Sequence, residues 1–394
     1  MRRRFTWACL AALVCALALL AAACGDDDDS SSTPAADTTA QGAGDERTQI
    51  AEESGLAAAG AAGTAVEVPK ITVGFVNIVG AVESAQRAER TFNEATDVLG
   101  WTVNRCDAQG DPTKMARCAD TLLDQNVDVL VVLGIEPSLI KAQLNKAKKQ
   151  NVPVVEFSGQ VAADPLFAGT YYPDEPAAGQ VLTDYLVEKL NALPDETVPI
   201  AVTDYPVEWS TARTDTLKAA VADQSKIDIA VEATTDAANL VEGTRKQVND
   251  QLTANPDLKA LWFGFDSAGQ AGAQAASAKF PGKTFPDKPL VVTFHADLAT
   301  IDLMRQGAID AVSDVPYDAS GWVAVDQIAQ FVARETPMAS EPQPQYEGIG
   351  DTYDYVVVDS SNLPPEGEYR TPEHDYQTFF TTKWSNEFTN VTGP

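Results

Sequence analysis

Apolar runs alternate with amphipathic stretches along the chain from residue 70 onward. A continuous apolar run is typical of a strand buried on both faces, and apolar residues at helical spacing indicate a helix with one buried face. The first part of this region predicts strands at 71–76, 102–106, 127–133 and 152–157. It predicts helices between them, over 82–98, 112–125 and 137–150. Such an alternation predicts a parallel sheet covered by helices.

The same rhythm returns after residue 197. Strands are predicted at 198–202, 227–231, 259–265, 290–294 and 309–312. Helices are predicted over 209–223, 238–254 and 297–306, with an Ala- and Gly-rich helix after residue 265. Two similar α/β lobes in tandem are therefore expected. Ligands bind beyond the carboxyl ends of the strands in such sheets, and two facing lobes would bring those ends to one cleft.

The first residues have the organisation of a secretory signal. Three arginines at 2–4 precede an uncharged, mostly apolar run over 5–20, and small residues lead to Cys24. The run is too short and wrongly flanked for a resident membrane span, so residues 1–23 are predicted to be a signal peptide. Residues 20–24 resemble a lipobox, which implies that Cys24 becomes a lipidated N-terminus on the outer face of the cytoplasmic membrane. An ordinary signal with an incidental cysteine is the alternative.

Residues 24–69 are expected to form a disordered tether. The stretch is rich in Asp, Ser, Thr, Ala, Gly and Glu and has few large apolar side chains, so it cannot offset the entropy of ordering. A flexible coil of this length would span about 35–40 Å. The remainder, 70–394, is long enough for two domains with their own cores.

Composition narrows the class of partner. The 394 residues carry a formal net charge of −29, which argues against nucleic acid or anionic lipid as a partner.

Cys9 and Cys15 leave with the signal peptide, so Cys106 and Cys118 remain in an oxidising compartment. A disulfide is expected between them because one ends a predicted strand and the other lies in the next helix. A metal pair is the rival, but two cysteines without a nearby histidine make a poor zinc set.

Several segments together carry a family resemblance. They are 71–76, 106–114, 127–132, 151–157, 255–262 and 289–294, with Gly307 downstream. Their order and spacing between about residues 70 and 390 resemble the type I periplasmic binding proteins of ABC transporters, in the ribose/galactose/xylose-type branch. The resemblance implies a monomer without cofactor or metal that closes on a solute and delivers it to an ABC permease.

The resemblance also implies how the chain is divided. It predicts an α/β fold of two doubly wound parallel-sheet lobes, joined by three crossing segments, with the ligand cleft between them. The crossings are expected near 192–197, 313–317 and 347–352. The N-lobe would comprise 70–192 and 316–348, and the C-lobe 193–315 and 349–394. The aromatic residues of the tail predict a docked terminal helix.

Five candidate ligand residues lie in the second half of the chain, at Trp209, Arg213, Asp266, His295 and Asp314. Arg213 matches the family arginine that contacts sugar hydroxyls, with a solvated helix arginine as the alternative. Asp266 keeps the acid of a family Asn-Asp pair in which Phe265 replaces the amide, and helix capping is its alternative. His295 stands where the family has an aspartate, and Asp314 stands near a hinge glutamine. Trp209 or Tyr205 is expected to supply the stacking face.

The first half supplies the other candidates, which are Asn77, Glu83, Glu136, Ser158 and Gln160. Asn77 and Glu136 follow predicted strands. Glu83 stands where the family often carries an aromatic ring, and Ser158 and Gln160 stand where an Asp-Arg pair is usual. The scaffold therefore matches the family better than the pocket does.

The function expected from these observations is a lipid-anchored solute receptor for a sugar or polyol. A receptor of the same fold for a nucleoside, a signalling furanone or an aromatic compound is the alternative. An enzyme is disfavoured because the chain has no Gly-x-Ser-x-Gly elbow, no His-Glu-x-x-His and no phosphate loop. A transcription factor with the same core would need a DNA-binding module where this chain has a signal peptide.

Overall fold

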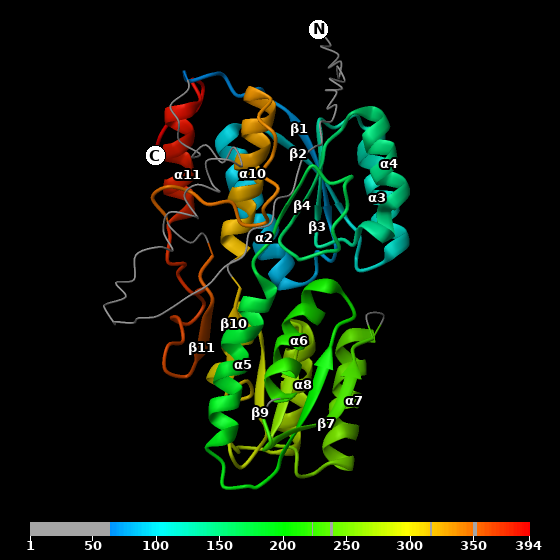
Figure 1. The fold of residues 1–394 in the computed structure, drawn as a ribbon, viewed down its shortest axis with the longest axis vertical. Helices are drawn as coiled ribbons and strands as arrows, with labels where there is room; N and C mark the ends of the chain where they lie inside the picture. The colour runs from blue at the N-terminus through cyan, green and yellow to red at the C-terminus, as the bar shows by residue number, and fades with distance from the viewer. Residues whose placement is uncertain (1–63, 223, 237–238, 316, 350–352) are drawn as a thin grey trace, which may run out of the picture. The chain divides into compact units, whose positions relative to one another are not determined.

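A computed structural model describes residues 64–222, 224–236, 239–315, 317–349 and 353–394. The predicted signal peptide, the lipidation site at Cys24 and most of the predicted tether lie outside the described residues. Within the described ranges the strands and helices build two α/β lobes, as the hydrophobic pattern predicts (Figure 1).

The N-lobe is built on a parallel sheet of five strands in the order β2-β1-β3-β4-β5. The strands are β1 (Thr72–Asn77), β2 (Thr102–Asp107), β3 (Val129–Leu133), β4 (Val154–Phe157) and β5 (Gly169–Tyr171). The connecting helices are α2 (Glu83–Leu99), α3 (Pro112–Asp124), the 3₁₀ turn η1 (Pro137–Ile140) and α4 (Lys141–Gln150). Figure 1 shows α2 on one side of this sheet and α3 with α4 on the other. The inner strands β1, β3 and β4 are buried on both faces, which explains their apolar runs, whereas the edge strand β2 is partly exposed.

The C-lobe sheet has the order β11-β10-β9-β8-β6-β7. Its strands are β6 (Val198–Asp204), β7 (Ile227–Thr234), β8 (Ala260–Phe263), β9 (Leu290–Phe294), β10 (Ala311–Asp314) and β11 (Val356–Asp359). All pairs are parallel except that of β11 with β10. The helices are α5 (Glu175–Asn191), α6 (Glu208–Ala222), α7 (Leu240–Ala254), α8 (Asp266–Lys279) and α9 (Leu298–Arg305).

The first lobe boundary differs from the expected one. Residues 70–192 were expected in the N-lobe, but α5, a helix that the sequence analysis did not predict, packs against α6 and the C-lobe sheet. Gly179 lets α5 approach α6 closely, because a Cβ at this position would lie 2.7 Å from the carbonyl oxygen of Arg213. The ion pair between Glu175 and Arg213 joins the same two helices. The first crossing therefore lies between β5 and α5 and not at 192–197.

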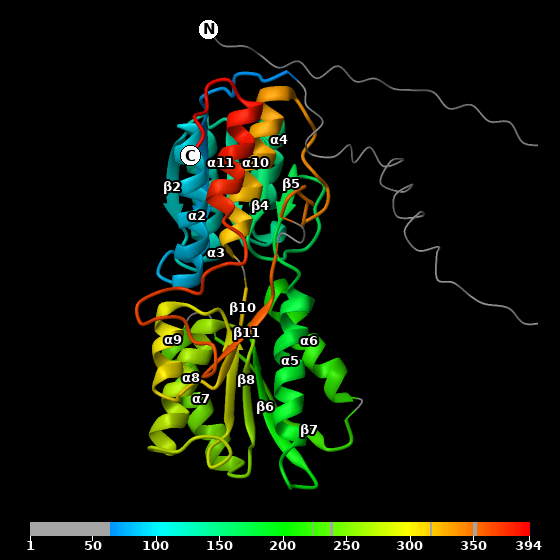
Figure 2. The ribbon, with the colours of Figure 1, turned by 90° about the vertical axis from the view of Figure 1, so that its left-hand side faces the viewer.

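The second difference concerns the tail. Helix α10 (Tyr317–Arg334) returns to the N-lobe and packs on α2, as expected, but α11 (Tyr376–Glu387) also joins the N-lobe instead of the C-lobe. Phe380 and Trp384 of α11 pack on Trp322 of α10, with ring centroids 6.1 and 5.7 Å apart. From the expected 349–394 segment, β11 joins the C-lobe sheet before the chain returns to α11 (Figure 2).

The N-lobe holds both ends of the described chain. Val66 forms a parallel β-bridge with Phe388, and the Val66 N–H donates to the carbonyl oxygen of Glu387 at 3.0 Å. The Asn390 amide bonds both backbone groups of Val68. Val66 and Val68 belong to the expected tether 24–69, so its last residues are fixed to the C-terminal segment and are not disordered as expected.

Cys106 in β2 and Cys118 in α3 form a disulfide with their Cα atoms 5.5 Å apart, which confirms the expected pairing. It fastens α3 to the edge strand of the N-lobe sheet. None of the helices in the described part of the chain is both long and apolar enough to cross a membrane.

Candidate functional site

A cavity of about 110 Å³ lies between the loops that follow the strands of the two lobes. Its N-lobe wall is mostly apolar and comes from the loops after β1, β3 and β4 and the start of α2. Its C-lobe wall is mainly aromatic. The cavity is thus at the place where α/β sheets bind ligands.

Three rings of the C-lobe form the aromatic wall. Tyr205 stacks on Trp209 with centroids 5.6 Å apart, and Phe265 lies 5.2 Å from Trp209 and 5.4 Å from Tyr205. We call these three residues the aromatic platform. Of the ten ligand residues expected from the sequence, Trp209 and Ser158 line the cavity. Phe265, which sequence reasoning treated only as a lost amide, lines it too.

Arg213 is fully buried and bonded to protein groups. Its Nε donates to Glu175 Oε2 at 2.6 Å, and its Nη1 donates to the carbonyl oxygen of Gly264 at 3.2 Å. Its guanidinium lies 5.2 Å from the Trp209 ring centroid. Burial works against the charge of Arg213, but Glu175 and Tyr317 outweigh it, so its pKa is raised. Arg213 therefore supports the aromatic platform from behind and does not line the cavity.

His295 is buried beside Arg213 and adopts a left-handed backbone conformation with φ of 65°. Its Nε2 lies 3.0 Å from the Tyr317 hydroxyl and 3.3 Å from Arg213 Nη1. Because a guanidinium can only donate, Nε2 acts as the acceptor toward Arg213 and the ring is neutral with its proton on Nδ1. Burial and the nearby positive charges of Arg213 and Arg87 lower its pKa well below the usual range, in accord with this state.

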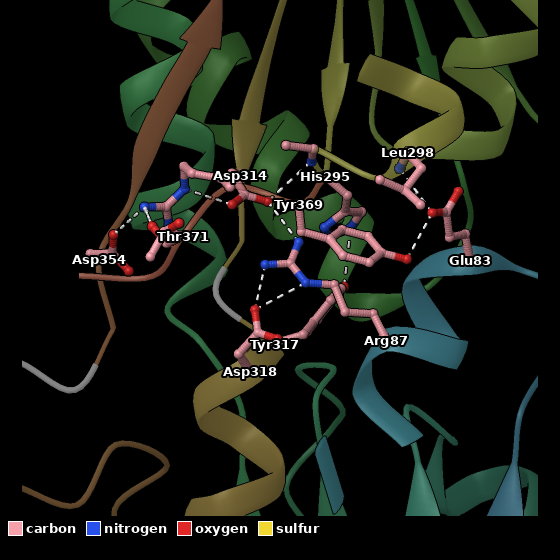
Figure 3. A network of polar contacts seen from close by, with 12 residues as sticks. Glu83, Arg87, His295, Leu298, Asp314, Tyr317, Asp318, Asp354, Tyr369 and Thr371 are labelled. Carbon is pink, nitrogen blue, oxygen red and sulfur yellow. Dashed lines mark hydrogen bonds and ion pairs between the residues drawn. The ribbon is translucent and has the colours of Figure 1, made fainter. Parts of the chain in front are cut away.

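Arg87 of α2 joins the lobes through a polar network (Figure 3). Its Nη1 lies 3.0 Å from Asp314 at the end of β10, and its Nη2 lies 2.5 Å from Asp318 of α10. Asp314 also accepts from Arg370 Nε at 2.8 Å. Burial alone would raise the pKa of Asp314, but the two arginines hold it below its usual value. Asp314 is thus an ion-pair partner here, and sequence reasoning missed both arginines.

Two expected ligand residues of the N-lobe bind helix N-termini of the C-lobe instead. Glu83 accepts from the N–H groups of Leu298 and Ala299 at 2.8 and 3.2 Å, at the start of α9. Glu136 accepts from the N–H of Glu208 at 3.3 Å, at the start of α6. Carboxylates are stabilised at helix N-termini by unpaired N–H groups and the helix dipole. These two glutamates hold the lobes together in the described state.

The remaining expected residues surround the cavity without lining it. Asn77 donates to Glu89 at 2.7 Å and accepts from the Val79 N–H at 2.9 Å, so both ends of its amide are engaged. Gln160 is half-buried after β4. Asp266 is buried at the first position of α8, where it accepts from the Ser267 hydroxyl at 3.0 Å. Within the described ranges no group of three or more His, Cys, Asp or Glu side chains is arranged to hold a metal ion.

Comparisons with known proteins agree with this architecture. A family model described as a periplasmic binding protein domain matches residues 73–336. A xylitol-binding protein of Mycolicibacterium smegmatis is 27% identical over 144 residues, which is 35% of this chain and 40% of that protein. The chain thus matches about 40% of the length of this curated relative.

Solved structures resemble the chain over most of its length. An ABC transporter solute binding protein from Bacillus halodurans with bound myo-inositol has a TM-score of 0.62 and 16% identity, and covers 75% of this chain and 97% of that chain. An ABC transporter solute binding protein from Mycobacterium smegmatis with bound glycerol has a TM-score of 0.63 and 21% identity. The match covers 75% of this chain and 96% of that chain. At these identities the likeness is one of fold.

Proposed function

We propose, from the premise that the chain belongs to the periplasmic binding protein family, that it captures a sugar or polyol between its lobes and delivers it to an ABC permease. The observation that carries the proposal is the cavity between the strand ends of the two lobes, walled by the aromatic platform. The names of the xylitol-binding, inositol-bound and glycerol-bound relatives support a polyhydroxy solute.

The platform suits the apolar side of such a solute. Aromatic rings cover the C–H surface of a sugar or polyol, and buried polar groups satisfy its hydroxyls. A solute lacking one hydroxyl leaves a buried acceptor unpaired, which is the physical source of specificity. No bond of the solute is made or broken in this scheme, and no cofactor takes part.

The proposed setting is the outer face of the cytoplasmic membrane. Residues 1–23 would direct export, a lipid on Cys24 would anchor the chain, and the part of residues 24–69 that precedes Val66 would act as the tether. The receptor would work as a monomer without nucleic acid as a partner, in keeping with a net charge of −29.

Thermal unfolding of protein purified from cells that express the full chain tests the proposal. Pentoses, hexoses and polyols are compared with nucleosides and small aromatic compounds. A solute at 100 times its Kd stabilises by about 2.7 kcal/mol, a readily measured shift. Trp209→Ala should weaken the shift, whereas Trp209→Phe, which keeps an aromatic face, should retain most of it. No shift with any sugar or polyol would contradict the proposal.

A second candidate is a receptor for an aromatic solute or a nucleoside. It is favoured by Phe265, whose ring lines the cavity at the position where the related family carries an amide. Shifts confined to the nucleosides and aromatic compounds of the panel would establish this candidate in place of the first.

A further inference from the structure

The described part of the chain has a crossing between the lobes beyond those that the family resemblance implies. Strand β11 pairs with β10 in the C-lobe sheet, whereas α11, the next element, packs on α10 and α2 of the N-lobe. The segment that joins them therefore runs from one lobe to the other. Figure 2 shows it in orange to red, passing the end of α2 at the junction of the lobes. We call residues 364–375 of this segment the strap.

The two ends of the strap are fixed to different lobes. Leu363, which precedes it, packs against the apolar core of the C-lobe. The carbonyl oxygen of Pro364 accepts from Nη2 of Arg305, at the end of α9. Tyr376, which follows the strap, is buried at the start of α11. The strap therefore spans the junction, and its contacts on the way decide whether it resists separation of the lobes.

Tyr369 of the strap contacts the N-lobe helix α2. Its hydroxyl donates to Glu83 Oε1 at 2.9 Å, and its ring centroid lies 5.4 and 5.1 Å from the guanidinium carbons of Arg87 and Arg90. Figure 3 shows the ring beside Arg87 with the hydroxyl directed at Glu83. Cations at such distances are attracted to an aromatic face. Because Glu83 also binds the N-terminus of α9, Tyr369 orients a carboxylate that bridges the lobes.

Arg370, the next residue of the strap, contacts the C-lobe. Its Nε donates to Asp314 Oδ2 at 2.8 Å, and its Nη1 donates to Asp354 Oδ2 at 2.7 Å. Asp314 is fully buried at the end of β10, and the Arg370 side chain is only 15% exposed. An ion pair so little exposed to water is costly to break, because the remaining charge stays buried without its partner.

We propose that the strap is a latch that holds the lobes closed in the solute-free protein, with Tyr369 and Arg370 as its positioning residues. The inference rests on the proposed function, since it concerns how the cavity admits a solute. Opening moves α2, with Glu83, away from α9 and from the end of β10. Two adjacent residues are joined by Cα atoms about 3.8 Å apart, so they cannot follow both lobes, and the contacts of one of them have to break.

The length of the strap shows that its contacts, and not its backbone, resist opening. A segment of this length spans at most about 40 Å when extended, which leaves the lobes free to part once the side chains let go. A solute enters and leaves through the open state. Weaker contacts of the strap therefore raise the rates of both entry and release, and they change Kd less than either rate.

Hydrogen–deuterium exchange of the solute-free full chain tests the latch at two separate places. The N–H groups of Leu298 and Ala299 are bonded across the junction by Glu83, and the N–H of Glu208 is bonded across it by Glu136. Exchange at such groups follows the population of the open form. Both places should exchange slowly in the unmodified protein, because the strap keeps the lobes closed.

Two variants of the strap should speed this exchange. Tyr369→Phe keeps the ring beside the arginines and removes only the donor to Glu83, so it is unlikely to disturb folding. Arg370→Met keeps the length of the side chain and removes its charge. Each should speed exchange at both places by about 10-fold or more, because a hydrogen bond to a charged group is lost. Glu366→Ala is the matched control, since its exposed side chain belongs to the same strap, and it should exchange as the unmodified protein does.

The outcomes separate the latch from the proposed function. Fast exchange at both places in the unmodified protein, no acceleration in either variant, or acceleration confined to Leu298 and Ala299 would overturn the latch and leave solute capture intact. Stopped-flow tryptophan fluorescence with xylitol, myo-inositol and glycerol adds a kinetic check, because Trp209 lines the cavity. Tyr369→Phe should raise the on-rate and the off-rate together, and a rise of the off-rate alone would overturn the latch. Absence of binding to all three solutes would contradict the proposed polyol function, while the exchange rates would still decide the latch.

Discussion

Replacement of Arg213 by alanine should destabilise the protein even when no solute is present. Arg213 and Glu175 are both fully buried, and the guanidinium bonds one oxygen of Glu175 while the other oxygen has no partner among the described residues. Removing one member of a buried ion pair leaves an uncompensated charge and typically costs about 3–5 kcal/mol. The variant also removes the bond to Gly264 and the support of the Trp209 ring.

Urea unfolding of the solute-free protein measures this loss. The matched variant is the double change Arg213→Met with Glu175→Leu, which removes both charges and fills the space with apolar atoms. Such replacements are often neutral or stabilising, so the double variant should recover most of the stability lost by Arg213→Ala. A loss below about 1 kcal/mol in the single variant would refute the reasoning, because it is the value of a solvent-exposed pair. A double variant as unstable as the single one would refute it as well.

Three further predictions concern other parts of the molecule. Replacing Cys106 and Cys118 by serine should lower the free energy of unfolding by about 3 kcal/mol in urea titrations, and reductant should have no added effect on that variant. Gly321→Val should lower the free energy of unfolding by about 1–3 kcal/mol in the same assay, because a Cβ at Gly321 would lie 2.5 Å from the backbone of α2. Gly243→Ala should be tolerated, because a Cβ at this helix position has more room. The pKa of buried His295 is lowered, so its contribution to stability is fully present above about pH 6.5 and is lost as the pH falls toward the lowered pKa. His295→Gln should therefore flatten the dependence of the unfolding free energy on pH below about pH 6.5.

The elements of the fold were readable from the sequence because their signal is local. A strand buried on both faces needs apolar residues at every position, and 129–133 displays this directly. The partner of an amphipathic helix is not encoded in the same way. The aromatic residues of the tail predict a docked helix, and α5 was not predicted, but in both cases the surface that buries the helix depends on contacts such as Gly179 with Arg213, far apart in sequence.

The site was predictable in position more than in detail. The family position of an aromatic ring drew attention to Glu83 and a strand end to Glu136, but their partners are N–H groups of the other lobe, which no local pattern reveals. Arg87 was overlooked because a charged residue on a helix is usually solvated, whereas here it is buried against Asp314.

The β-bridge between Val66 and Phe388 has a consequence for the order in which the molecule is made. The N-lobe begins first as the chain is synthesised, yet it needs α10, α11 and the last residues to cover α2 and to hold its opening segment. The C-lobe, whose last strand is β11, has all its parts earlier. The lobe that starts first is thus the last to be completed, and part of its apolar surface stays uncovered until α11 and the segment after it have been synthesised. Loss of the segment from α11 onward would therefore leave a completed C-lobe joined to an incomplete N-lobe.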